Sequence, residues 1–82
     1  MVKIFLDARE MEHPEPLVQS VEHLKTMDED SYLYMLNTLN PLPLLDIAKN
    51  NGFYSFSYED DSGIWHIMIA KRELDFETLL DV

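Results

Sequence analysis

The stretch from Leu6 to Pro16 constrains the fold most, because it joins a strand pattern to a helix start within a few residues. It reads Leu-Asp-Ala-Arg-Glu-Met-Glu-His-Pro-Glu-Pro. The β-branched and aromatic run from Val2 to Leu6 predicts a strand that ends just before Asp-Ala-Arg. Pro14 suits the first helical position, and Pro16 is tolerated in the first turn, where N–H groups lack acceptors within the helix. We therefore expect a strand, a short loop and a helix.

Two helices and a second strand follow from the spacing of apolar residues. Apolar positions three and four apart predict one buried face on the first helix: Leu17, Val18, Val21, Leu24 and Met27. The run from Ser31 to Asn37 is rich in Tyr, Leu and Met and predicts a central strand. Pro43 is expected to open a second helix that ends at Asn50-Asn51-Gly52, because Gly and Asn accept the left-handed conformation at a helix end. The inward residues of this helix are expected to be Leu44, Ile47 and Ala48.

A hairpin pattern completes the domain. Tyr54, Phe56 and Tyr58 alternate with Ser55, Ser57 and Glu59, and the turn signal Asp60-Asp61-Ser62-Gly63 precedes a second alternating run from Trp65 to Ala70. The predicted order is β-α-β-α-β-β, an α+β two-layer sandwich with a four-stranded mixed sheet and two helices on one face. We expect the other face to be more polar, with Ser55, Ser57, Glu59 and His66 pointing outward.

Residues 1–72 are expected to form this domain, and residues 73–82 an acidic amphipathic extension. In the extension, Leu74, Phe76, Leu79 and Leu80 alternate with acidic residues at helix-like spacing. A short helix that packs back on the domain is the simpler interpretation, and a partner-binding segment is the alternative.

Composition excludes several classes of function. The net charge is −10, from sixteen acidic and six scattered basic residues, so a nucleic acid or an anionic membrane is not expected as a direct partner. There is no Cys, which removes disulfides, thiolate metal sites and cysteine nucleophiles. No secretion signal or apolar run long enough to span a membrane is apparent, and we expect a cytoplasmic protein.

Ordered motifs resemble those of the TusA/SirA-like superfamily of small two-layer proteins. The signature of that superfamily is a strand, Asp-x-Arg, and then Cys-Pro-x-Pro at the start of the first helix. Here Asp7-Ala8-Arg9 is present, and His13-Pro14-Glu15-Pro16 replaces Cys-Pro-x-Pro. The chain is most similar to an uncharacterised branch with His-Pro at this position, and the residues that fit in order are Arg9, His13-Pro14, Asn37, Pro41-Leu42-Pro43-Leu44 and Trp65.

The resemblance implies a change of chemistry at His13. In sulfur-carrier members a Cys thiolate at the helix start carries a persulfide, and an imidazole cannot do so. Sulfur transfer by that mechanism is therefore not expected. Some relatives in the branch carry additional histidines before the second helix, whereas this chain has Thr38 and Leu39 there.

The candidate binding residues are Arg9, His13, Pro14, Glu15 and Pro16. His13 could bind a divalent metal with Glu10 and Glu12, act as an acid or base, contact an anion, or simply pack the loop. Arg9 could bind an anion or form an ion pair with Asp7 or Glu12. His23 and His66 are expected to face solvent, and Asp60-Asp61 to form a turn.

Two functional hypotheses follow, and an enzyme is the weakest third because no catalytic set is apparent. The first is a binding or adaptor domain for a protein partner or small ligand, with no cofactor. The alternative is a metal- or redox-linked accessory domain that uses His13 and nearby carboxylates.

Overall fold

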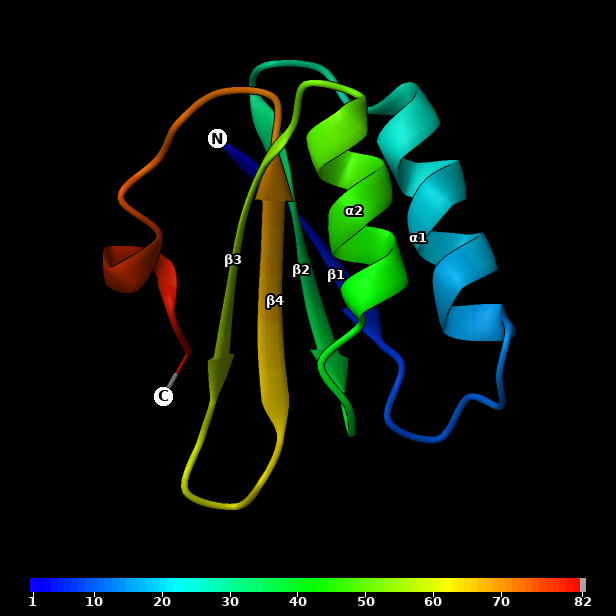
Figure 1. The fold of residues 1–82 in the computed structure, drawn as a ribbon. Coiled ribbons are helices and arrows are strands. Elements are labelled where there is room, and N and C mark those ends of the chain that lie inside the picture. Colours follow the sequence, from blue (N-terminus) through cyan, green and yellow to red (C-terminus); the bar gives the residue numbers. More distant parts are fainter. Residues whose placement is uncertain (82) are drawn as a thin grey trace.

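The structure, a computed structural model, describes residues 1–81 (Figure 1). In chain order the elements are β1 (Val2–Asp7), α1 (Glu15–Thr26), β2 (Ser31–Asn37), α2 (Leu42–Asn50), β3 (Tyr54–Glu59), β4 (Trp65–Ala70) and the 3-10 helix η1 (Phe76–Leu79). The predicted order of strands and helices is confirmed. No helix in this part of the chain is long and apolar enough to cross a membrane.

The four strands form one mixed sheet in the order β1-β2-β4-β3. β1 runs parallel to β2, whereas β4 runs antiparallel to both of its neighbours, β2 and β3. A parallel pair needs a long crossover, and α1 provides it. Both helices lie on one face of the sheet (Figure 1). The predicted α+β two-layer architecture is therefore confirmed, and β2 is a central strand.

The face beneath the helices forms the main apolar core. Its fully buried side chains come from alternate positions of β2 and β4 and from the inward side of α2: Leu33, Met35, Ile67, Ile69, Leu44 and Ala48. The predicted stripe on α1 places Leu24 and Met27 in this core. Val18, however, is 53% exposed. It follows Leu17 directly, and adjacent helix residues do not share a face.

The opposite face of the sheet is aromatic, so the expectation of a polar face was wrong. Ser57 pairs with the core residue Ile67, which puts it on the helix side, and Phe56 pairs with Met68 on the other side. By the same alternation, Ser55, Ser57 and Glu59 lie on the helix side, and Tyr54, Phe56 and Tyr58 lie opposite. Serines are accommodated on the helix side because β3 is an edge strand. Alternation separates two sets of side chains without saying which set meets the helices.

The segment after β4 covers the aromatic face. Phe76 is buried and its ring stacks on Phe56, with centroids 6.0 Å apart. The leucines of the segment pack against the same cluster: Leu74, Leu79 and Leu80. The Asp81 N–H donates to the Tyr34 hydroxyl at 2.8 Å, and the Asp81 carboxylate pairs with Lys3. We call residues 73–81 the C-terminal cover; residue 82 of the predicted extension lies outside the described residues.

Candidate functional site

The carboxyl ends of β1 and β2 meet at one edge of the sheet, because these strands are parallel. Residues 8–14 lead from β1 into α1, and residues 38–41 lead from β2 into α2, so both helices begin at this edge (Figure 1). Open α/β sheets commonly bind ligands in the crevice beyond the carboxyl ends of their strands. All five predicted binding residues belong to the first loop or to the start of α1.

Both helices begin with a proline at the second helical position. α1 starts at Glu15, one residue later than predicted, with Pro14 as its N-cap and Pro16 second. α2 starts one residue before Pro43, which the sequence had predicted as its first. The His13-Pro14 peptide bond is cis. Neither helix has a side-chain cap, since proline occupies both N-cap positions and offers no side-chain acceptor.

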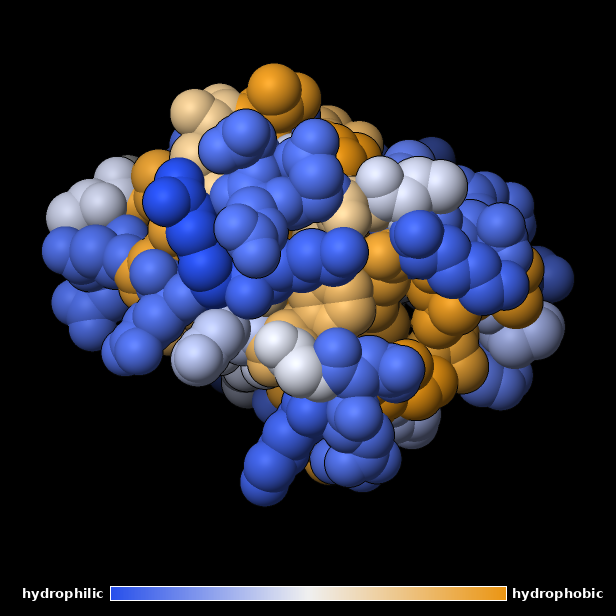
Figure 2. All heavy atoms as spheres, turned by 90° about the horizontal axis from the view of Figure 1, so that it is seen from above, coloured by the Kyte–Doolittle hydropathy of each residue, from blue (hydrophilic) through white to orange (hydrophobic). Residues whose placement is uncertain are grey.

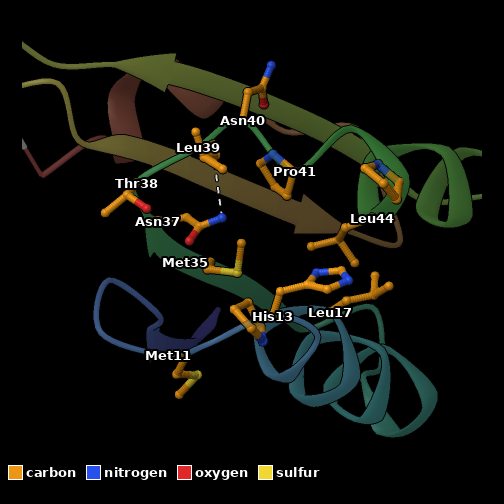
Figure 3. Close-up of a pocket in the computed structure, with 12 residues that line it drawn as sticks. Met11, His13, Leu17, Met35, Asn37, Thr38, Leu39, Asn40, Pro41 and Leu44 are labelled. Carbon is orange, nitrogen blue, oxygen red and sulfur yellow. Dashed lines mark hydrogen bonds between the residues drawn. The ribbon is translucent and has the colours of Figure 1, made fainter.

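A cavity of about 240 Å³ lies between the two loops and the helix starts (Figure 3). Its lining residues are Met11, His13, Pro16, Leu17, Met35, Asn37, Thr38, Leu39, Asn40, Pro41, Pro43 and Leu44. The lining contains no Lys, Arg, Asp or Glu. The cavity is therefore mainly apolar, with His13 as its one ionisable side chain.

The His13 ring lies in the middle of this group, beside Met35, Leu17 and Leu44 (Figure 3). Its position depends on the loop that precedes α1, and the side chain as a whole is exposed. An imidazole between apolar side chains can donate or accept one hydrogen bond to a group that enters the cavity. The structure thus brings two predicted residues, His13 and Pro16, to the cavity.

Asn37 at the end of β2 and Thr38 and Asn40 of the second loop supply the remaining polarity. The Asn37 amide Nδ2 donates to the Leu39 carbonyl at 3.0 Å, which ties the loop to the end of β2. Asn40 Oδ1 is buried and has no hydrogen-bond partner in the described chain. A buried acceptor without a partner costs roughly 1–3 kcal/mol. A bound group with an N–H or O–H donor would satisfy it.

Arg9 lies outside the cavity lining and forms a local ion pair. Its Nε and NH2 atoms lie 2.9 and 2.8 Å from the two carboxylate oxygens of Asp7. This hydrogen bonding lowers the pKa of Asp7 from 3.8 to about 2 and raises the pKa of Arg9. Of the two interpretations of Arg9, the ion pair with Asp7 is the one that the structure contains.

The acidic residues around His13 do not line the cavity. Glu10 and Glu12 are exposed, and Glu15 accepts a hydrogen bond from the Gln19 amide at 2.8 Å. Within residues 1–81, no three side chains of His, Asp or Glu are grouped so that they could hold a metal ion. A divalent metal on His13, Glu10 and Glu12 stays a prediction.

His66 was expected to face solvent, but it is 5% exposed and sits in a polar chain beneath the C-terminal cover. Its Nδ1 lies 2.6 Å from the Tyr34 hydroxyl, and its Nε2 lies 2.8 Å from Asp60 Oδ2. A carboxylate only accepts, so we infer that Nε2–H donates to Asp60 and that Nδ1, the other ring nitrogen, accepts from the Tyr34 hydroxyl. This bond from His66 lowers the pKa of Asp60, and burial raises the pKa of Tyr34.

Sequence reasoning missed several cavity residues, although some signals were present. The sequence analysis names Asn37, Pro41, Pro43 and Leu44 for the family resemblance or for the second helix, but not as binding residues, and all four line the cavity with His13. Asn40 precedes a proline in a loop and has no sequence feature that predicts burial. The contact between Asp60 and His66 was also missed, because Asp60 was predicted only as a turn residue and His66 as facing solvent.

The fold is similar to that of a SirA-like protein from Desulfitobacterium hafniense, whose crystal structure superposes with a TM-score of 0.70. The two chains are 25% identical, and the match covers 89% of this chain and 100% of the other. A search of curated proteins finds no significant match. Residues 5–71, which include the cavity and most of the sheet, match the model of one protein family. The chain therefore belongs to the family described as Uncharacterized conserved protein (DUF2249).

Proposed function

We propose that this chain is a small cytoplasmic binding or adaptor domain that receives an uncharged group in the cavity beside His13. The observation that carries the proposal is the composition of that cavity. Its lining is mainly apolar, lacks any Lys, Arg, Asp or Glu, and includes Asn40, whose Oδ1 is buried and has no partner in the described chain. These features favour binding of a group that is apolar except for a single hydrogen-bond donor.

The volume of the cavity limits the size of the group that it can bind. Drug-sized ligands occupy pockets of roughly 300–1,000 Å³, and this cavity holds about 240 Å³. A single ring system or one side chain of a partner protein is the appropriate scale. Leu39, which lines the cavity, and the adjacent Leu42 are 72% and 61% exposed, so apolar surface continues outside it. A partner protein that inserts a Trp or Tyr side chain would cover this surface, and we favour it as the occupant.

A sulfur-carrier role is not part of the proposal. The resemblance to the TusA/SirA-like superfamily places His13 where carriers have their cysteine, and the sequence has no Cys elsewhere. A persulfide requires a thiol. The His-Pro branch of the superfamily, in which this replacement is typical, is the group to which we assign the chain. An enzymatic role is disfavoured because His13 has no hydrogen-bonded acid or nucleophile beside it among the described contacts.

Indole tests the proposal, because it has the apolar body and the N–H donor of a Trp side chain. We expect indole to shift the backbone amide NMR signals of Met11, Leu39 and Leu44. We expect 1-methylindole, which lacks the donor, to bind about tenfold more weakly, as the loss of about 1.4 kcal/mol would produce.

Leu39→Asp provides the matched variant, because it places a carboxylate at the exposed edge of an apolar cavity. It should abolish the shifts. Val18→Asp is the control, since Val18 is also exposed and apolar but does not line the cavity. Equal affinity for indole and 1-methylindole would show that Asn40 does not accept a hydrogen bond from the indole N–H. Unchanged affinity of Leu39→Asp for indole would contradict the proposed site.

A further inference from the structure

A second cavity lies at the opposite end of the molecule, where both helices end. It has a volume of about 420 Å³ and is lined by Val21, Leu24, Lys25, Ile47, Asn51, Phe53 and Lys71. These residues come from the second half of α1, the last turn of α2, the connection between α2 and β3, and the loop after β4. Figure 2 looks onto this end and shows apolar side chains in a hollow bordered by hydrophilic ones.

The charge of this cavity is opposite to that of the whole chain. The chain has sixteen acidic and six basic residues. The lining holds two of the basic residues, Lys25 and Lys71, and no acidic residue. The remaining lining is apolar apart from Asn51, whose Nδ2 already donates to the Ile47 carbonyl at 2.8 Å. An apolar hollow with two ammonium groups is therefore unlike the uncharged cavity beside His13.

The two ammonium groups can approach a bound anion. Lys25 lies 3.3 Å from Glu22, but both side chains are about two-thirds exposed (65% and 66%), and such surface pairs are weak. Lys71 takes part in no ion pair among residues 1–81. Long lysine side chains can turn their charged ends toward a ligand while their stems stay on apolar surface.

Helix-end electrostatics alone do not account for this arrangement. A lysine in the last turn of α1 offsets the partial negative charge of that helix end, which explains Lys25. Lys71 follows a strand, so it has no such role in its own element. Each helix end contributes about half a negative charge, and two ammonium groups exceed the sum. Glu22, the partner of Lys25, offsets the remaining positive charge, but it does not line the cavity, so the charged side chains that line it are both positive.

We propose that this second cavity binds a small amphipathic anion, an apolar body with one carboxylate. The apolar body contacts Leu24, Ile47 and Phe53, and the carboxylate lies between Lys25 and Lys71. A volume of about 420 Å³ falls within the usual range of ligand pockets. A fully ionic or polynucleotide ligand is disfavoured, because only two cations are present and the rest of the chain is acidic.

Octanoate is the probe, and octanol and octylammonium are the controls with the same chain and different charge. NMR titration of the full-length protein should show octanoate shifting the signals of Val21, Ile47 and Phe53, with affinity that falls as NaCl is raised. Octanol should bind at least fivefold more weakly, and octylammonium weaker still. The signals of Leu39 and Leu44, which report on the first cavity, should not move.

Single lysine substitutions identify the anion contacts. Lys71→Gln and Lys25→Gln should each weaken octanoate binding at least threefold. Lys49→Gln is the matched control, because Lys49 is an exposed lysine near the end of α2 that does not line the cavity. Equal affinity for octanoate and octanol, or a Lys71→Gln variant that binds like Lys49→Gln, would overturn the proposal. Indole binding at the first cavity is independent of either result.

Discussion

The two faces of the sheet are buried by different kinds of interaction. The helix face is covered by α1 and α2, and its core is made of aliphatic residues and methionine. The opposite face is covered by the nine residues of the C-terminal cover, and its core is largely aromatic. It also contains the polar chain from Asp60 through His66 and Tyr34 to the Asp81 N–H.

This difference explains how a segment as short as the C-terminal cover is held in one position on the sheet. Apolar burial is non-directional, so the helix face needs two helices whose positions are set by packing over a large area. The C-terminal cover has less area, and it is positioned by one aromatic stack and by hydrogen bonds of fixed direction. Leu33 and Tyr34 are adjacent on β2, are both fully buried and point to opposite faces, so they allow a direct comparison.

Leu33→Ala is expected to have the largest effect. It deletes a fully buried side chain at the centre of the helix face and leaves a cavity between well-ordered elements. The free energy of unfolding should fall by about 2–5 kcal/mol, measured by urea denaturation. Val2→Ala is the control, since Val2 is 64% exposed on β1 and its truncation should change little. If Leu33→Ala lowered the free energy of unfolding by less than Phe76→Ala or Tyr34→Phe does, the helix face would not be the main core.

Phe76→Ala should have a smaller effect, although a larger side chain is removed. The C-terminal cover can detach locally, so no enclosed cavity persists, and the loss is that of burying Phe, about 1.5–3 kcal/mol. Hydrogen exchange should accelerate for the Asp81 amide, while the amides of β4, which pair with β2 and β3 within the sheet, and those of α1 and α2 stay protected. Glu77→Ala, an exposed change in the same turn, is the control. Acceleration of the α1, α2 and β4 amides together with the Asp81 amide would show that the C-terminal cover and the helix face unfold as one unit.

Tyr34→Phe tests the directional part of the second face. It keeps the ring but removes the hydroxyl that joins His66 Nδ1 to the Asp81 N–H. The buried His66 Nδ1 and the partly buried Asp81 N–H each lose a hydrogen bond, and we expect the free energy of unfolding to fall by about 1–3 kcal/mol. Tyr58→Phe is the matched control, because Tyr58 lies on the same face, is 37% exposed and has no hydroxyl hydrogen bond among the described residues. Equal losses in both variants would show that the polar chain contributes nothing specific.

The sequence predicts the helix face better than the second face. Helical spacing and prolines at the helix starts are local signals, and they place α1 and α2 to within one residue at their starts. The orientation of β3 depends on which set of its alternating side chains meets a cover, and that cover comes from Phe76, seventeen to twenty-two residues away along the chain. No local pattern encodes such a contact. His66 was misplaced for a similar reason, because it is buried against Tyr34, a residue of β2 that is thirty-two positions away in the chain.

The candidate site shows the same limit. The motif around His13 is visible in the sequence, its resemblance to the TusA/SirA-like helix start predicts a site there, and the structure has a cavity at this position. The cavity also needs Asn40 and Leu39, which reach it only because the parallel pair of β1 and β2 brings two loops to one edge. An arginine such as Arg9 can bind an anion, but its guanidinium is already hydrogen-bonded to the carboxylate of Asp7, two residues earlier.

The exposed pair of Arg9 and Asp7 belongs to neither face and should show the smallest effect. The pKa of Asp7 is about 2, mainly through the Arg9 side chain and also through the Arg9 backbone N–H. Arg9→Gln should therefore raise the pKa of Asp7 toward, but not fully to, its usual 3.8, as measured by carboxyl carbon NMR. Arg72→Gln is the control and should leave the Asp7 titration unchanged, since Arg72 forms no ion pair among residues 1–81.

The sign of the pH dependence follows from this lowered pKa. A carboxyl group whose pKa is lower in the folded state stabilises that state above its unfolded pKa, and the contribution disappears as the pH falls through the folded value. The stability difference between the unmodified protein and Arg9→Gln should thus be constant above about pH 4 and vanish toward pH 2. Because both side chains are more than two-fifths exposed (45% and 42%), added salt should shrink this difference. It should leave the Leu33→Ala and Tyr34→Phe losses nearly unchanged, because buried packing and buried hydrogen bonds are not screened in this way.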